Sequence, residues 1–195
     1  MAEKELHTDY DMIVFTAPSG AGKTTVVKHL LNKYTEKLGF SISATTRDRR
    51  EGEIDGKDYY FLSVEEFRVL IDEDKLIEWE EVYPGKYYGT LKTEVGRMLE
   101  SGKKLLFDID VMGAESIKEK YGDRCLAVFV KPPSFSILVN RLRDRNTESP
   151  ESFKNRIKKV KREMTHEHSF DYVLLNDELE DTLRNAEELI KNHLS

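Results

Sequence analysis

Residues 12–24 read MIVFTAPSGAGKT, and this segment decides the fold. Its first four residues are apolar and β-prone, so we expect a short buried strand over 12–15. The glycine-rich stretch after it predicts a tight loop. Over residues 23–38 the apolar side chains recur with helical spacing, and Gly39 stands where a helix usually ends. A strand, a tight loop and a helix are therefore expected in direct succession.

The loop has the spacing of a phosphate-binding loop (P-loop), which is a glycine, four residues and then Gly-Lys-Ser/Thr. Gly22, Lys23 and Thr24 match this pattern, and Ala17 replaces the first glycine, which is acceptable if its φ is negative. Lys23 is expected to reach the β- and γ-phosphates of a nucleoside triphosphate, and the Thr24 hydroxyl to hold Mg²⁺. The backbone N–H groups and the helix dipole add to phosphate binding. The expected ATP contacts are Ala17, Pro18, Ser19, Gly20, Ala21, Gly22, Lys23, Thr24 and Thr25.

The rest of the chain alternates strand-like apolar runs with helical patterns. Further strands are predicted over 104–110, 126–130 and 172–175. This alternation indicates an α/β fold: a three-layer P-loop core with a mainly parallel sheet covered on both faces. Helices are predicted to begin at capping signals around Ser63, Ser134 and Ser149–Pro150, and the spacing of apolar residues predicts a C-terminal helix from Glu178.

Two aspartates, Asp108 and Asp110, end the predicted strand 104–110. Strand alternation places both on the same side. Ligands bind at the carboxyl ends of strands in open α/β sheets, so these side chains are candidates for the nucleotide site. We assign Asp108 to the Mg²⁺ shell, through water. A pair of solvated aspartates at a strand end is the alternative.

Composition limits the classes of function. The chain has 195 residues and a net charge of −6, which argues against a general nucleic-acid binder. Its single cysteine, Cys125, lies in an apolar run, which favours a core residue over a reactive thiol. A single cysteine cannot form an internal disulfide, so a cytoplasmic protein is expected. Residues 1–11 are polar and do not resemble a secretory signal, and no apolar run approaches the roughly 18 residues of a membrane span.

A basic segment follows the predicted strand 126–130. Residues 141–162 contain nine Lys or Arg and three Asp or Glu. Arg141 and Arg145 are four residues apart, on one helical face. Arginine stabilises the charge that develops on a transferring phosphoryl group, so these two are candidates for catalysis. A solvated helix face accounts for most of the lysines.

Residues 40–90 are rich in Gly, Thr and Tyr and predict a small β-rich insert. Arg47 and Arg50, with nearby tyrosine hydroxyls, are suited to gripping a second phosphate. Glu78 stands beside Trp79, as a carboxylate in a partly apolar setting. A surface insert with no ligand is the alternative.

Taken together, these motifs resemble guanylate kinase, over nearly the whole chain from Met12 to the C-terminal helix. The family's P-loop also begins with alanine. Thr90 stands where the family often has serine, and the turn 82–86 is longer. The motifs are residues 17–23 (APSGAGK), 43–50 (SATTRDRR), 56–59 (GKDY), 77–79 (IEW), 88–89 (YG), 108–110 (DID) and 141–145 (RLRDR).

The resemblance implies a single domain over residues 1–195 with three parts: a core (about 10–39, 91–130 and 168–195), a GMP-binding insert (about 40–90) and a helical lid (about 131–167). It assigns the GMP phosphate to Arg47, Arg50, Tyr59 and Tyr88. It assigns the guanine to Ser43, Glu78 and Thr90, with Asp110 close by. It places Asn176 near the ATP adenine. The implied catalytic residues are Lys23, Arg47 and the lid arginines Arg141, Arg145 and Arg156.

The implied reaction is ATP + GMP ⇌ ADP + GDP with Mg²⁺, in purine nucleotide metabolism, with small-molecule substrates and neither nucleic acid nor membrane as partner. Two alternatives stay open. One is a P-loop kinase for another nucleotide or metabolite. The other is a non-catalytic, guanylate-kinase-like module that binds peptides, against which Lys23 and Thr24 argue. The sequence does not indicate an oligomeric state.

Overall fold

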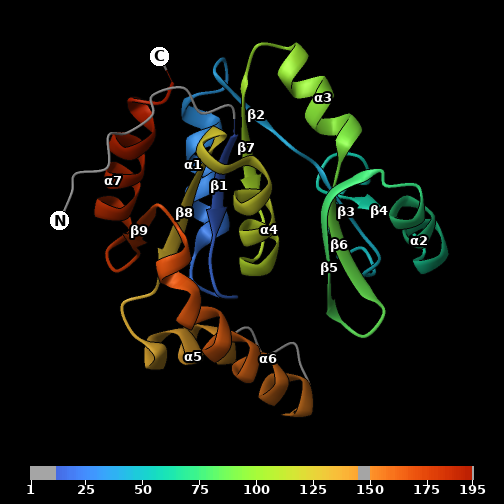
Figure 1. Cartoon of the computed structure of the whole chain (residues 1–195). Coiled ribbons are helices and arrows are strands. Elements are labelled where there is room, and N and C mark those ends of the chain that lie inside the picture. Colours follow the sequence, from blue (N-terminus) through green and yellow to red (C-terminus); the bar gives the residue numbers. More distant parts are fainter. Residues whose placement is uncertain (1–11, 145–149, 195) are drawn as a thin grey trace. The chain divides into compact units, whose positions relative to one another are not determined.

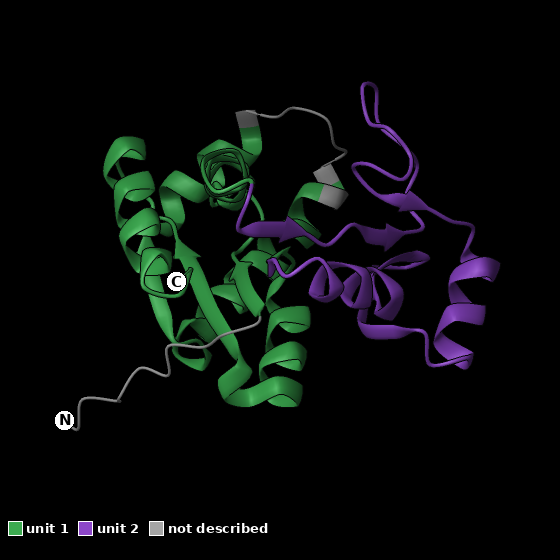
Figure 2. Cartoon of the chain, turned by 90° about the horizontal axis from the view of Figure 1, so that it is seen from above, with its two compact units in different colours: residues 1–35, 106–195 green, residues 36–105 purple. Residues whose placement is uncertain are grey.

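The computed structural model describes residues 12–144 and 150–194 (Figure 1). The chain divides into two compact units (Figure 2). The first contains residues 1–35 and 106–195, and the second contains residues 36–105. The predicted insert 40–90 lies within the second unit, and the predicted lid 131–167 within the first. The exact bounds of core, insert and lid stay predictions.

The central sheet has the strand order β2-β7-β1-β8-β9. Strands β1 and β8 pair in parallel with Val14 opposite Ala127, and β8 and β9 with Phe129 opposite Val173. The α/β class and the mainly parallel sheet are confirmed. The strands are β1 (Met12–Thr16), β2 (Leu38–Phe40), β7 (Lys104–Asp108), β8 (Cys125–Lys131) and β9 (Tyr172–Leu175).

Apolar side chains fill the centre of this sheet. All residues of β1 are buried, as are the first six of β8. Cys125 is fully buried, and burial raises the pKa of its thiol to about 12, which confirms it as a core residue. No helix in the described part of the chain is long and apolar enough to cross a bilayer.

Helices pack on this sheet (Figure 1). Helices α1 and α7 contact each other, α4 packs on β1 and β8, and α5 contacts α6. The C-terminal helix and the helices after Ser134 and at Pro150 were all predicted. The helices are α1 (Lys23–Lys33), α4 (Val111–Tyr121), α5 (Phe135–Asp144), α6 (Pro150–Glu163) and α7 (Leu179–Lys191), with short 3₁₀ turns η1 (Gly122–Arg124) and η2 (Met164–Ser169).

The predicted end of the first helix is wrong. Helix α1 ends at Lys33 rather than near residue 38, and Gly39 lies in β2. The Thr35 hydroxyl donates to the carbonyls of Leu31 and Asn32, both at 3.0 Å. This side chain thus bonds the last-turn carbonyls and competes with continued helix.

The second unit is built on a four-stranded sheet in the order β4-β3-β6-β5, which confirms a β-rich insert. Its core contains Ala44, Phe67, Leu76 and Tyr87. Helix α2 begins with the predicted capping box of Ser63, whereas α3 was not predicted. The elements are β3 (Ser43–Thr45), β4 (Tyr60–Phe61), α2 (Val64–Asp72), β5 (Leu76–Tyr83), β6 (Lys86–Leu91) and α3 (Lys92–Glu100).

Candidate functional site

The loop between β1 and α1 has the geometry that phosphate binding needs. The Ala21 N–H donates to the Pro18 carbonyl at 3.1 Å, which closes a tight turn. Gly20 and Gly22 have φ of +88° and +93°, in the left-handed region that favours glycine. Ala17 is not among the described residues with positive φ, so alanine fits there without strain.

Asn176 supports this loop from the end of β9. Its side-chain amide donates to the Ala21 carbonyl at 2.6 Å, and its own N–H donates to the Lys131 carbonyl at 2.7 Å. A Cβ added to Gly22 would lie 2.1 Å from the Asn176 amide nitrogen. Asn176 therefore positions the P-loop; its place near the adenine stays a prediction.

Lys23 opens α1 and donates a hydrogen bond to the Asp108 carboxylate at the end of β7. Burial lowers the pKa of Lys23 to about 8, although the nearby carboxylates of Asp110 and Glu163 oppose that shift. The P-loop lysine thus lies among three carboxylates. Such a cluster favours the ammonium form that contacts phosphate.

Thr24 and Thr25 lie exposed in the first turn of α1. The Thr24 hydroxyl and the Asp108 carboxylate are hard oxygen donors of the kind that Mg²⁺ takes together with phosphate oxygens. Both groups belong to the first unit, at the helix start and at a strand end. The donor chemistry therefore fits Mg²⁺.

The prediction that the strand extends to Asp110 is wrong. The strand ends at Asp108, and Asp110 is the N-cap of α4, accepting the Gly113 N–H at 3.0 Å. An aspartate satisfies the first turn of a helix in this way, so the backbone leaves the strand there. Its predicted place close to the guanine is a separate expectation and stays a prediction.

A buried carboxylate that the sequence did not single out, Glu163, lies beside the P-loop at the end of α6. Lys159 lies 3.6 Å from Glu163 and 3.5 Å from Asp110. Burial raises the pKa of Glu163, while Lys159 and a hydrogen bond from the Ser19 N–H favour its ionised form. This cluster links α6 and α4 to the phosphate-binding loop.

The lid arginines are placed only in part. Arg141 lies in α5 and Arg156 in α6, both partly exposed, and Arg145 lies outside the described residues. Helix α5 packs directly on the P-loop, because a Cβ at Gly20 would meet the Leu142 side chain at 2.8 Å. Arg141 therefore directly precedes Leu142, the residue of α5 that lies against Gly20 of the P-loop.

In the second unit, three predicted guanine-binding residues lie side by side. Ser43 on β3 pairs with Thr90 on β6, and Thr90 pairs with Glu78 on β5. The Thr90 hydroxyl donates to Glu78 Oε1 at 2.6 Å. Glu78 is only 8% exposed and Thr90 is fully buried, whereas the neighbouring Trp79 is half exposed. Glu78 is therefore a buried carboxylate and not a surface one.

The predicted phosphate-binding residues also gather in the second unit. The Arg47 guanidinium lies over the Tyr59 ring, 4.9 Å from its centroid, and the Tyr59 and Tyr88 rings meet edge to face at 6.2 Å. Arg50 follows on the same loop, with an exposed side chain. Burial raises the pKa of Tyr59, so its hydroxyl remains a donor at neutral pH.

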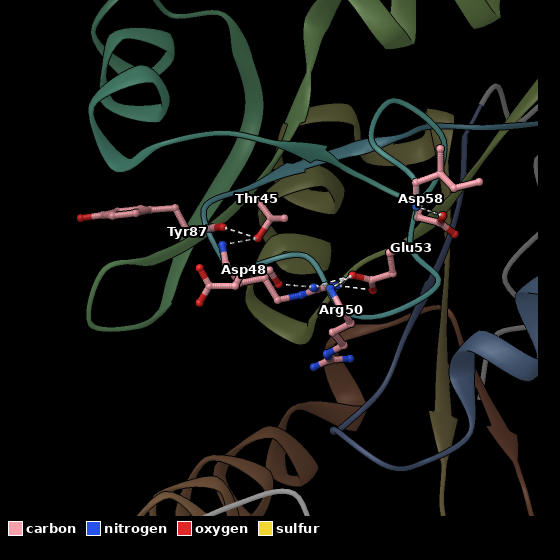
Figure 3. A network of polar contacts seen from close by, with 8 residues as sticks. Thr45, Asp48, Arg50, Glu53, Asp58 and Tyr87 are labelled. Atoms are coloured by element: carbon pink, nitrogen blue, oxygen red, sulfur yellow. Dashed lines mark hydrogen bonds and ion pairs between the residues drawn. The ribbon is translucent and has the colours of Figure 1, made fainter.

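Glu53, also missed by the sequence analysis, joins this cluster through Arg47 and Arg50; Figure 3 shows Glu53 beside Arg50. It binds both the Arg47 side chain and the Arg50 backbone. The signal was present in the sequence: Gly52 after Arg50 predicts a turn, and a turn brings residues 50 and 53 together. Glu163 had no comparable signal, because only tertiary packing brings it to the P-loop.

Comparison with known proteins identifies the family of the chain. The guanylate kinase family model matches residues 10–193. The chain is 51% identical over 168 residues to a guanylate kinase of Porphyromonas gingivalis, covering 86% of this chain and 89% of the relative. It is 46% identical over 184 residues to a guanylate kinase of Bacteroides thetaiotaomicron, covering 94% and 90%. A crystal structure of guanylate kinase from Anaplasma phagocytophilum superposes with a TM-score of 0.74 at 28% identity, covering 97% of this chain and 88% of that one. The chain therefore belongs to the guanylate kinase family.

Proposed function

We propose that this protein transfers the γ-phosphate of ATP to GMP, giving ADP and GDP, with Mg²⁺ bound alongside ATP. The buried carboxylate of Glu78 is the observation that carries this choice of acceptor. Guanine presents two adjacent donors, N1–H and the 2-amino group, and a carboxylate presents two acceptors. Adenine presents a lone pair at N1 and no 2-amino group. A buried Glu78 therefore favours guanine.

Ser43 and Thr90 complete the guanine-binding set on adjacent strands. The Thr90 hydroxyl orients the Glu78 carboxylate through its 2.6 Å bond. Threonine in place of serine keeps this hydroxyl donor. Asp110, in the other unit, is assigned to the guanine by family resemblance alone.

The GMP phosphate is assigned to Arg47, Arg50, Tyr59 and Tyr88. Two guanidinium groups and two phenolic hydroxyls match a phosphate dianion in charge and in donors. The cluster lies in the same unit as Glu78, so one compact unit holds groups for both ends of GMP.

The ATP phosphates are assigned to the P-loop, where the start of α1 and Lys23 supply positive charge. Mg²⁺ is assigned to Thr24 and, through water, to Asp108; the ion supplies charge neutralisation at the phosphates when bound. A phosphate oxygen of GMP attacks the γ-phosphorus in line, and the bond to the β-phosphate oxygen breaks. Lys23, Arg47, Arg141, Arg145 and Arg156 stabilise the charge that develops. No covalent enzyme intermediate is required.

The test is a coupled assay of ADP release with GMP, AMP, UMP, CMP and dTMP, each with ATP and Mg²⁺. We expect turnover with GMP and at most trace turnover with the others. Equal rates with another monophosphate, or none with GMP, would overturn the assignment. We also propose a cytoplasmic location, where ATP and GMP are both available.

A further inference from the structure

The Glu53 carboxylate lies within the predicted phosphate cluster, yet the proposed chemistry gives it no role. It ends a tight turn in which the Glu53 N–H donates to the Arg50 carbonyl at 3.2 Å. Gly52, at the third position of this turn, has φ of +83°. That position favours glycine, so the local sequence fixes where Glu53 stands.

One carboxylate connects the two arginines assigned to the phosphate (Figure 3). Glu53 Oε1 accepts from Arg47 Nη2 at 2.5 Å, and Oε2 accepts from Arg47 Nη1 at 2.7 Å. Oε2 also accepts the Arg50 backbone N–H at 2.8 Å. The side chains of Arg47 and Glu53 are only 11% and 19% exposed, so this is not a loosely solvated surface pair.

The remaining donors of Arg47 suit a phosphate. A guanidinium has five N–H donors. Nη1 uses its two on Glu53 and on the Asp48 carbonyl, at 2.7 and 2.8 Å, and Nη2 uses one on Glu53. In the hydrogen bonds among the described residues the Nε–H and the second Nη2–H take no part, and together they form a side-on fork of the kind that binds phosphate oxygens in pairs.

Packing places Tyr59, which is assigned to the GMP phosphate, beside the Arg47 guanidinium. The guanidinium lies over the rings of Tyr59 and Phe61, at 4.9 and 5.5 Å from their centroids. Arg47 also interacts with the Tyr59 hydroxyl, which lowers the pKa of that phenol against the larger effect of burial.

We propose that Glu53 is a positioning residue for the GMP phosphate: it fixes the Arg47 guanidinium so that its side-on fork is kept for the ligand, and it ties that side chain to the Arg50 backbone. The inference rests on the proposed function. Free arginine side chains populate many rotamers, and a fixed one loses less entropy on binding. The Arg47 guanidinium lowers the pKa of Glu53 to about 2, so the carboxylate is ionised at neutral pH.

The test compares Glu53→Gln with Glu51→Gln. Glu51 is exposed on the same turn, so both variants remove one negative charge within two residues. The steady-state assay varies GMP and ATP separately, and calorimetry measures GMP binding alone. For Glu53→Gln we expect the KM and Kd for GMP to rise about tenfold to a hundredfold, as for misplacement of a binding group. The KM of Glu53→Gln for ATP is expected to stay within about twofold of that of the unchanged protein. For Glu51→Gln, the KM for ATP and the KM and Kd for GMP are all expected to stay within about twofold.

Two results would overturn the inference. In one, Glu53→Gln and Glu51→Gln change GMP binding equally, which means that only long-range charge matters. In the other, Glu53→Gln binds GMP more tightly, which means that Glu53 competes with the phosphate for Arg47. Should Glu53→Gln fail to fold, Glu53→Asp serves instead, since an aspartate is too short to keep both Nη bonds and is expected to raise the KM for GMP likewise.

Arg47→Ala separates this inference from the proposed function. If Arg47→Ala leaves GMP binding unchanged, the phosphate site itself is misassigned. If Arg47→Ala weakens GMP binding and the Glu53 variant does not, the phosphate site stands and the positioning role of Glu53 is wrong.

Discussion

Replacing Glu78 by Gln tests how the protein selects its base. The change keeps the volume of the side chain and replaces one acceptor oxygen by an NH₂ donor. The Thr90 hydroxyl donates to Oε1 at 2.6 Å, and this bond keeps the amide oxygen at that position. The new NH₂ group then occupies the position of Oε2, where a guanine N–H would otherwise be accepted. The new NH₂ group and the guanine N–H, both hydrogen-bond donors, would then face each other.

The structure allows an estimate of the loss. A hydrogen bond to a charged group contributes about 1.5–3 kcal/mol, and each 1.4 kcal/mol is about tenfold. Because Glu78 is 8% exposed, water cannot easily replace the lost partner. We expect kcat/KM for GMP to fall by about a hundredfold. The ratio of kcat/KM for GMP to kcat/KM for AMP should fall by a similar factor, because adenine has neither an N1–H nor a 2-amino group to donate to this oxygen.

The assay is ADP release with GMP or AMP varied at saturating ATP, with thermal unfolding measured for each variant. Glu65→Gln is the matched control, since Glu65 is an exposed carboxylate on α2 of the same unit. It should leave both constants within about twofold. If Glu78→Gln changes kcat/KM for GMP and the ratio by less than about threefold, the guanine assignment has to be withdrawn.

Three other substitutions and one labelling experiment have definite expected outcomes. Lys23→Ala should lower kcat by at least about a hundredfold while circular dichroism stays native; near-normal turnover would refute its phosphate role. Arg47→Ala should raise the KM for GMP by about tenfold to a hundredfold and leave that for ATP nearly unchanged; equal effects would contradict two separate phosphate sites. Asn176→Ala should raise the KM for ATP by up to about tenfold through loss of its P-loop bond, and an effect on GMP alone would argue against this role. Cys125, whose thiol has a pKa raised to about 12 by burial, should react with a thiol reagent at pH 8 about a hundredfold more slowly in native protein than in urea; equal rates would show that the thiol is accessible.

Local signals predicted much of the fold correctly. The P-loop pattern fixed β1 and the start of α1, and the Ser63 capping box fixed the start of α2, since both depend on neighbours within a few residues. The end of α1 was predicted wrongly, since residues 38–40 join the central sheet as β2 and the Thr35 hydroxyl bonds the carbonyls of Leu31 and Asn32. Helical periodicity does not report that competition.

The site was predictable where the residue types themselves define the chemistry. The pattern and the resemblance named Lys23, Arg47 and Glu78, and the structure places each of them in a polar cluster. Asp110 was assigned to a strand because strand alternation gives no weight to a capping bond. Glu163 was missed because it reaches the P-loop from a helix more than a hundred residues away, and no pattern within one segment reveals such packing.

The contact between Gly22 and Asn176 also has a consequence for the order in which the protein becomes competent during synthesis. The P-loop is made well before the amide that braces it, which follows β9. A nascent chain therefore carries the complete glycine-rich loop long before it carries the brace. Full nucleotide affinity is expected only after Asn176 has left the ribosome. ATP would then stabilise chains that contain Asn176 more than chains truncated before Tyr172.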